Sequence, residues 1–138
     1  MKVLVDTNVL LSAALNPNGT AARAYFKATE LPYECVLCDY CIDEFKRGVR
    51  NKLSKYIADF DSFLATALIT AKVIYAPLDE GTTGEELIRD MKDQPIIMAA
   101  MNNKIDIILT GDKDFLASGI QKPMMISPTD FLKLEVKR

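Results

Sequence analysis

Short apolar runs alternate with longer amphipathic segments along the whole chain, and this alternation constrains the fold more than any other feature. Strands buried on both faces of a parallel sheet read as short apolar runs, and the helices between them show a 3.6-residue period. The pattern predicts strands at residues 3–5, 34–37, 73–75, 105–110 and 123–126. It predicts helices at residues 8–14, 20–28, 39–49, 55–71, 85–91 and 128–134, with one more that begins at 93–95 and continues through 101. We therefore expect an α/β fold with a parallel sheet of about five strands flanked by helices.

The length of the chain suits one domain. With 138 residues, of which 49% are hydrophobic and 26% charged, it is long enough for one packed core and too short for two ordinary ones. We expect a single domain over residues 1–138. No window is apolar enough to span a membrane and no signal peptide follows Met1, so we also expect a cytoplasmic protein.

Acidic residues stand where several apolar runs end. Asp6 and Asp112 follow two predicted strands, Asp114 comes close behind, and Glu44 and Asp93 lie on or beside predicted helices. Helix capping explains Asp93 equally well, but we do not expect it to explain Asp6 and Asp112 together. Ligands of open α/β sheets bind beyond the carboxyl ends of the strands. Carboxylates gathered there repel one another, and a bound divalent cation such as Mg²⁺ or Mn²⁺ usually neutralises this repulsion.

The chain contains no histidine, which excludes a histidine-based ribonuclease mechanism and a Ser-His-Asp triad. Cys35, Cys38 and Cys41 have the spacing of half an iron–sulfur motif, but no fourth cysteine completes a tetrahedral site. We expect reduced cysteines, with Cys35 ending a strand and Cys41 facing the core from a helix.

Four short motifs contain these acids. They are Val5–Leu10 (VDTNVL), Asp43–Phe45 (DEF), Arg89–Pro95 (RDMKDQP) and Thr110–Phe115 (TGDKDF). In this order and spacing they resemble the successive motifs of the PIN-domain nucleases. More narrowly, the chain is similar to the VapC toxins, the toxin components of bacterial and archaeal toxin–antitoxin pairs. The resemblance covers nearly the whole chain.

The resemblance implies a Rossmann-like (PIN) fold and a hydrolase, a metal-dependent endoribonuclease. The residues carried over by position as catalytic acids are Asp6, Glu44, Asp93, Asp112 and Asp114. The first four would also bind Mg²⁺ or Mn²⁺, and Thr7, Asn8 and Thr110 would support them. Asp90 and Asp43 remain alternatives to their neighbours Asp93 and Glu44. Residues one apart on a helix point about 100° away from each other, so Asp43 and Glu44 cannot both face the site.

The resemblance also implies an RNA substrate, a homodimer and a small antitoxin protein whose segment blocks the acidic pocket. The net charge of −2 argues against a polyanionic substrate at first, but without the five site acids 14 acidic residues stand against 17 basic ones. A run of basic residues follows Glu44 and could contact the phosphate backbone, although a solvated helix face explains it equally well: Lys46, Arg47, Arg50, Lys52 and Lys55.

Two other classes of protein with acidic sites fit less well. A phosphoacceptor receiver domain needs an aspartate at the end of its central strand, and residues 73–77 contain none. A phosphatase of the haloacid dehalogenase type would have a second aspartate where this chain has Asn8. A housekeeping RNA-processing nuclease and a catalytically inactive PIN-like binding module remain open.

Overall fold

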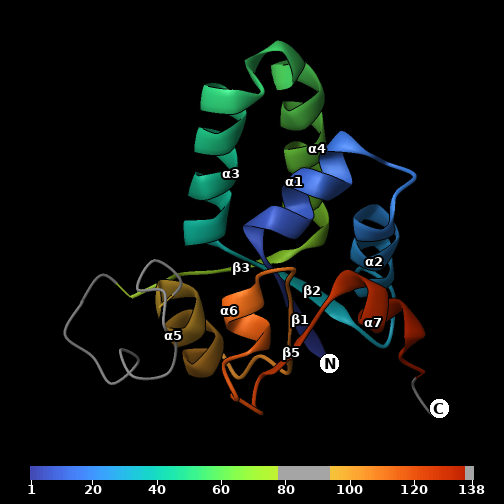
Figure 1. Ribbon diagram of the computed structural model, residues 1–138. Helices are drawn as coiled ribbons and strands as arrows, with labels where there is room; N and C mark the ends of the chain where they lie inside the picture. The colour runs from blue at the N-terminus through green and yellow to red at the C-terminus, as the bar shows by residue number, and fades with distance from the viewer. Residues whose placement is uncertain (78–93, 136–138) are drawn as a thin grey trace.

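The computed structural model describes residues 1–77 and 94–135. Its strands are β1 (Lys2–Val5), β2 (Glu34–Cys38), β3 (Lys72–Ile74), β4 (Ile107–Leu109) and β5 (Met124–Ile126). They form one sheet in the order β3-β2-β1-β4-β5, with all neighbouring strands parallel (Figure 1). The expected α/β fold with a five-stranded parallel sheet flanked by helices is confirmed.

The helices of the described residues mostly follow the predicted periods. They are α1 (Thr7–Leu15), α2 (Thr20–Ala28), α3 (Asp39–Lys52), the 3₁₀ turn η1 (Ser54–Tyr56), α4 (Ile57–Thr70), α5 (Gln94–Asn102), α6 (Lys113–Leu116) and α7 (Pro128–Lys133). The short helix α6 was not predicted. The helix predicted at 85–91 lies outside the described residues. No helix among the described residues has both the length and the apolar character needed to cross a membrane.

The side chains of each strand alternate between two cores, because successive residues of a strand point to opposite faces of the sheet. Val3 and Val5 of β1 belong to the larger core, which the strands share with α1, α2, α3, α4 and α7. Leu4 belongs to the second core, which contains Phe115 of α6 and the apolar side chains of α5. The two groups of helices lie on opposite sides of the sheet in Figure 1. Strands buried on both faces explain why their sequences are continuously apolar.

One local expectation was wrong. Cys35 lies inside β2 rather than at its end, because β2 continues to Cys38. Cys38 is the N-cap of α3, and Asp39 is its first helical residue. Met101, near the carboxyl end of α5, is exposed. The thiols of all three cysteines are free and buried.

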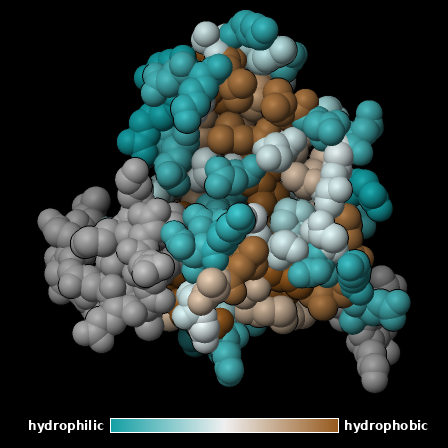
Figure 2. All heavy atoms as spheres, in the orientation of Figure 1, coloured by the Kyte–Doolittle hydropathy of each residue, from teal (hydrophilic) through white to brown (hydrophobic). Residues whose placement is uncertain are grey.

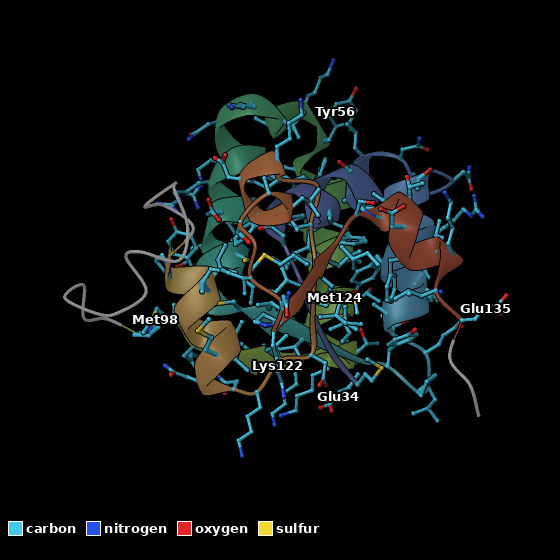
Figure 3. The ribbon with its side chains drawn as sticks, turned by 60° about the horizontal axis from the view of Figure 1, so that its bottom comes forward. Glu34, Tyr56, Met98, Lys122, Met124 and Glu135 are labelled. Carbon is cyan, nitrogen blue, oxygen red and sulfur yellow. The ribbon has the colours of Figure 1, made fainter. Side chains whose placement is uncertain are left out.

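The strand order reverses direction between β1 and β4, which makes their carboxyl ends a topological switch point. In open parallel sheets, ligands bind in the crevice outside such a point. Figure 3 brings forward the other end of the sheet, where the strands begin. Glu34 at the start of β2 and Lys122 just before β5 lie there, whereas Tyr56 at the end of η1 lies at the far side of the view. A ligand-binding site is therefore expected just after Val5 and Leu109.

Candidate active site

Asp6 follows β1 and is held by hydrogen bonds to both carboxylate oxygens. Its backbone N–H donates to Leu109 O (3.0 Å), which extends the pairing of β1 with β4. The Thr7 N–H donates to Asp6 Oδ1 (2.8 Å), so that Asp6 caps the N-terminus of α1. The Thr110 hydroxyl donates to Asp6 Oδ2 (2.8 Å). These contacts fix a carboxylate that is only 4% exposed at the switch point of the sheet.

Burial raises the pKa of Asp6 from 3.8 to about 6. The hydrogen bonds from Thr110 and Thr7 oppose this rise, while the negative charges of Glu44 and Asp112 add to it. Among the described residues, the two charges that act on the Asp6 carboxylate are therefore both negative. A group in this environment gains from a cation placed among the three carboxylates.

Thr110 connects Asp6 to Asp112. It is fully buried just after β4, and its hydroxyl accepts a hydrogen bond from the Asp112 N–H (3.0 Å) while it donates to Asp6. Asp112 Oδ1 in turn accepts from the Asp114 N–H (2.8 Å), which makes Asp112 the N-cap of α6. The chain leaving β4 thus places a second carboxylate beside Asp6.

Glu44 reaches the same place from α3. The Thr7 hydroxyl donates to Glu44 Oε1 (3.0 Å) and lies 3.4 Å from Cys41 O. Thr7 therefore binds Asp6 through its backbone N–H and Glu44 through its side chain. The hydroxyls of Thr7 and Thr110 thus bind the carboxylates of Glu44 and Asp6, and Thr110 also accepts from the backbone N–H of Asp112. These contacts bring together three acidic residues from different parts of the chain.

The structure places the other predicted site residues differently. Asn8 and Asp114 are exposed. Asp114 contacts Asp112 through its backbone N–H, which donates to the Asp112 carboxylate. Asp43 is exposed, while its neighbour Glu44 contacts Thr7. Asp93 and its alternative Asp90 lie outside the described residues. The expectation that capping does not explain Asp6 and Asp112 was wrong, since both are N-caps whose oxygens also belong to the cluster.

The donor chemistry of this cluster fits a hard divalent cation. Carboxylate and hydroxyl oxygens are the ligands of Mg²⁺ and Mn²⁺, and nothing here resembles the nitrogen and sulfur sets of zinc. In residues 1–77 and 94–135, however, no three acidic, histidine or cysteine side chains come close enough to hold a metal ion on their own. Within these residues, Asp6, Glu44 and Asp112 therefore do not complete a metal site by themselves.

Comparison with known proteins identifies the family. Residues 2–114 match the model of the PIN domain. The chain belongs to the PIN domain family. It is 32% identical over 124 residues to the uncharacterized protein MJ1680 of Methanocaldococcus jannaschii, covering 85% of this chain and 74% of that protein.

Solved structures share the PIN fold at low sequence identity. VapC20 of Mycobacterium tuberculosis, described as a sarcin–ricin loop cleaving toxin, is 17% identical with a TM-score of 0.57, over 86% of this chain and 95% of that chain. A chain of VapBC2 from Rickettsia felis, solved bound to a promoter DNA fragment, is 14% identical with a TM-score of 0.68. The match covers 92% of this chain and 98% of that chain. PAE2754 of Pyrobaculum aerophilum is 17% identical with a TM-score of 0.60, and the match covers 96% of this chain and 88% of that chain.

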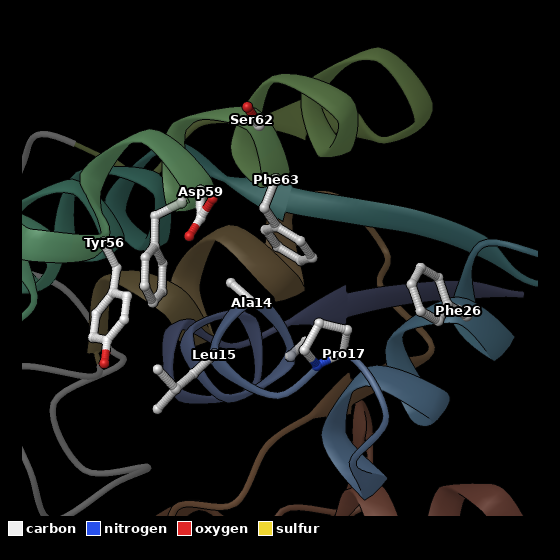
Figure 4. Close-up of a pocket in the computed structure, with 10 residues that line it drawn as sticks. Ala14, Leu15, Pro17, Phe26, Tyr56, Asp59, Ser62 and Phe63 are labelled. Carbon is white, nitrogen blue, oxygen red and sulfur yellow. The ribbon is translucent and has the colours of Figure 1, made fainter.

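Two hollows of this PIN domain differ sharply in character. One, of about 570 Å³, is lined by Tyr40, Glu44, Arg47, Gly48, Asn51 and Lys52 and so includes a site carboxylate. The other, of about 480 Å³, lies at the carboxyl end of α1, against α2 and α4, with Leu15, Phe26 and Phe63 among its apolar walls (Figure 4). Asp6 caps the opposite end of α1. Of these two hollows, it is therefore the first that includes a residue of the carboxylate cluster.

Sequence reasoning missed two features around the site. Asp39 Oδ1 accepts from the Tyr40 N–H (2.8 Å) and the Ala76 N–H (2.7 Å), which ties the chain after β3 to the start of α3. Tyr40 and Asn51, which line the hollow beside Glu44, were also missed. Helical spacing is the signal that could have found them, because they occur four and seven positions from Glu44.

Proposed function

We propose that this PIN domain is a divalent-metal-dependent endoribonuclease that hydrolyses RNA phosphodiester bonds as the toxin of a type II toxin–antitoxin pair. The observation that carries the proposal is the cluster of Asp6, Glu44 and Asp112, linked by two threonine hydroxyls at the switch point of the sheet. The fold shared with a toxin described as cleaving the sarcin–ricin loop supports the choice of RNA.

The residues of this chain perform a positioning task. Asp6, Glu44, Asp93 and Asp112 are the proposed metal ligands and catalytic acids, with Asp114 as an outer acid. A bound Mg²⁺ or Mn²⁺ would supply Lewis-acid activation of a water molecule and neutralise charge on the phosphate. Thr7 and Thr110 fix the rotamers of Asp6 and Glu44 before substrate arrives. Preorganised groups of this kind lower a barrier because they need not reorganise during the reaction.

We further propose a homodimer and a small antitoxin protein as the partners of this chain. The structural likeness to a chain of the VapBC2 complex supports the second partner. Co-expression with the product of the adjacent gene tests it: a stable complex in which RNA cleavage is suppressed supports the toxin assignment. Cleavage without a suppressing neighbour would favour a housekeeping RNA-processing nuclease.

The nuclease proposal is tested by incubating the purified protein with a pool of structured and single-stranded RNA in Mn²⁺, Mg²⁺ or chelator. We expect metal-dependent cleavage that Asp6→Asn and Asp93→Asn abolish. Asp61→Asn, which removes an exposed acid of α4, is the matched control and should cleave like wild type. Asp43→Asn and Asp90→Asn decide the two positional alternatives. A wild-type protein that cuts no RNA with either metal would point to an inactive binding module.

A further inference from the structure

The basic residues that follow Glu44 do not form one patch, because α3 divides them between two hollows. Arg47 lines the hollow of about 570 Å³ that also contains Glu44. Lys46 and Arg50 line a different hollow of about 240 Å³, together with Asp61 of α4 and the apolar Phe45, Val49 and Ile57. The two hollows share no lining residue.

Helical geometry explains the division. At 100° per residue, Arg47 lies about 60° from Glu44 around the axis of α3, Asn51 about 20° and Lys52 about 80°. Lys46 and Arg50 lie about 160° and 120° away, on the side that turns toward α4. The exposed side chains of Arg47, Asn51 and Lys52 thus continue the face of α3 that presents Glu44.

This face bears positive charge beyond its single carboxylate. Gly48 stands between Glu44 and Lys52 and lines the hollow without a side chain of its own. Glycine inside a helix costs about 1 kcal/mol relative to alanine. The packing of α3 does not require it, since an added Cβ would meet Leu11 Cδ1 at an ordinary 3.5 Å. Figure 2 shows hydrophilic side chains over α3 in the upper left of the view.

We propose that this face of α3 binds the phosphate backbone of the RNA strand next to the bond to be cleaved. Arg47 and Lys52 would each contact a phosphate, and the Asn51 amide would donate a hydrogen bond to the same strand. From Glu44 to Lys52 the face extends roughly 12 Å along the helix axis, which allows contacts to successive phosphates. Lys46 and Arg50 are excluded from this role. The proposal names the substrate contacts of the proposed nuclease and so rests on that function.

The test measures RNA binding without cleavage. In an Asp6→Asn/Asp112→Asn background and in chelator, the affinity for a labelled mixed-sequence single-stranded RNA is followed from 50 to 200 mM salt. Each lost contact to a single strand lowers the slope of log affinity against log salt by about 0.7, or roughly 3-fold in the affinity change over this range. Arg47→Gln and Lys52→Gln should each show this loss. Lys46→Gln and Arg50→Gln remove the same charge from the neighbouring face and should retain the slope of the background protein.

The outcomes separate this proposal from the nuclease proposal. Selective loss with Arg47→Gln and Lys52→Gln supports the RNA-binding face even if the wild-type protein cleaves no RNA with any metal. Equal losses in all four variants would overturn it and indicate general attraction by surface charge. An unchanged slope with Arg47→Gln and Lys52→Gln, or no RNA binding by the background protein, would also overturn it while metal-dependent cleavage stands. Circular dichroism melting of each variant shows that α3 remains folded.

Discussion

Asp6→Asn should stabilise the metal-free protein at neutral pH, although it alters the most buried acid of the site. Burial raises the pKa of Asp6 from 3.8 to about 6. A carboxyl group whose pKa is higher in the folded than in the unfolded state stabilises the fold at pH values below its unfolded pKa, which is near 3.8 here. This stabilisation is lost as the pH rises through the folded-state pKa of about 6. Two pKa units correspond to about 3 kcal/mol at neutral pH. The ionised Asp6 thus destabilises the metal-free fold by roughly this amount.

Asparagine removes the charge but retains part of the hydrogen bonding. Its Oδ1 can still accept from the Thr7 N–H, so the cap of α1 remains. Its amide group cannot accept from the Thr110 hydroxyl, which donates to Asp6 Oδ2 in the wild type. That mismatch costs about 1 kcal/mol. The expected net gain is therefore about 2 kcal/mol in the free energy of unfolding at pH 7.5, falling to zero or below at pH 4.

Urea unfolding at pH 7.5 and pH 4 in chelator measures this difference. Asp61→Asn removes an exposed negative charge and controls for the net charge of the chain, so it should change stability by less than about 0.5 kcal/mol at either pH. Adding millimolar Mn²⁺ should raise the melting temperature of the wild type more than that of Asp6→Asn, because the metal binds the folded state. An Asp6→Asn protein that is equally destabilised at both pH values would refute the reasoning, since the capping role would then outweigh charge repulsion.

Three further predictions concern groups around the two cores. Thr110→Val should lower stability by about 1–3 kcal/mol and raise the pKa of Asp6, measured by urea unfolding and by NMR titration of the carboxyl carbon, because the buried Asp6 loses a donor. Lys27→Met should lower the free energy of unfolding by about 1–3 kcal/mol, because the Lys27 ammonium donates to the carbonyls of Phe131 (2.7 Å) and Leu134 (2.6 Å). Lys133→Met, which replaces an exposed lysine of α7, is the control. The three cysteines should react with a thiol reagent only after unfolding, because burial raises the pKa of each thiol, and fast labelling of the native protein would contradict this.

The sheet was predictable because burial on both faces leaves a plain signature. Val3 to Val5, Val36 to Cys38 and Ile107 to Leu109 are continuously apolar since alternate residues belong to different cores. The carboxyl ends of the strands follow directly from these runs. Strand lengths were less predictable, since the apolar Ile105 and the β-branched Thr110 suggested a longer strand but lie outside β4. Short helices such as α6 give too few turns for their period to appear in the sequence.

The site was predictable only as a set of acids. That Asp6 and Asp112 cap helices while their oxygens join the cluster depends on tertiary hydrogen bonds from Thr7 and Thr110, which no spacing reveals. The two roles are compatible, because an N-cap uses one carboxylate oxygen for the backbone. Capping and catalysis should therefore not be treated as competing explanations for an acid at the end of a parallel strand.

The basic run after Glu44 shows how a charge pattern must be resolved before it predicts binding. Taken as a block, Lys46, Arg47, Arg50, Lys52 and Lys55 suggested one surface beside the site. On a helix that lies against α4, only the residues within about 80° of Glu44 share its hollow, and this condition keeps Arg47 and Lys52 and removes Lys46 and Arg50. Under the proposed binding mode, the salt dependence of RNA binding should follow the rotation of α3 about its axis and not the number of its positive charges. Substitution by face rather than by charge is the informative experiment on this helix.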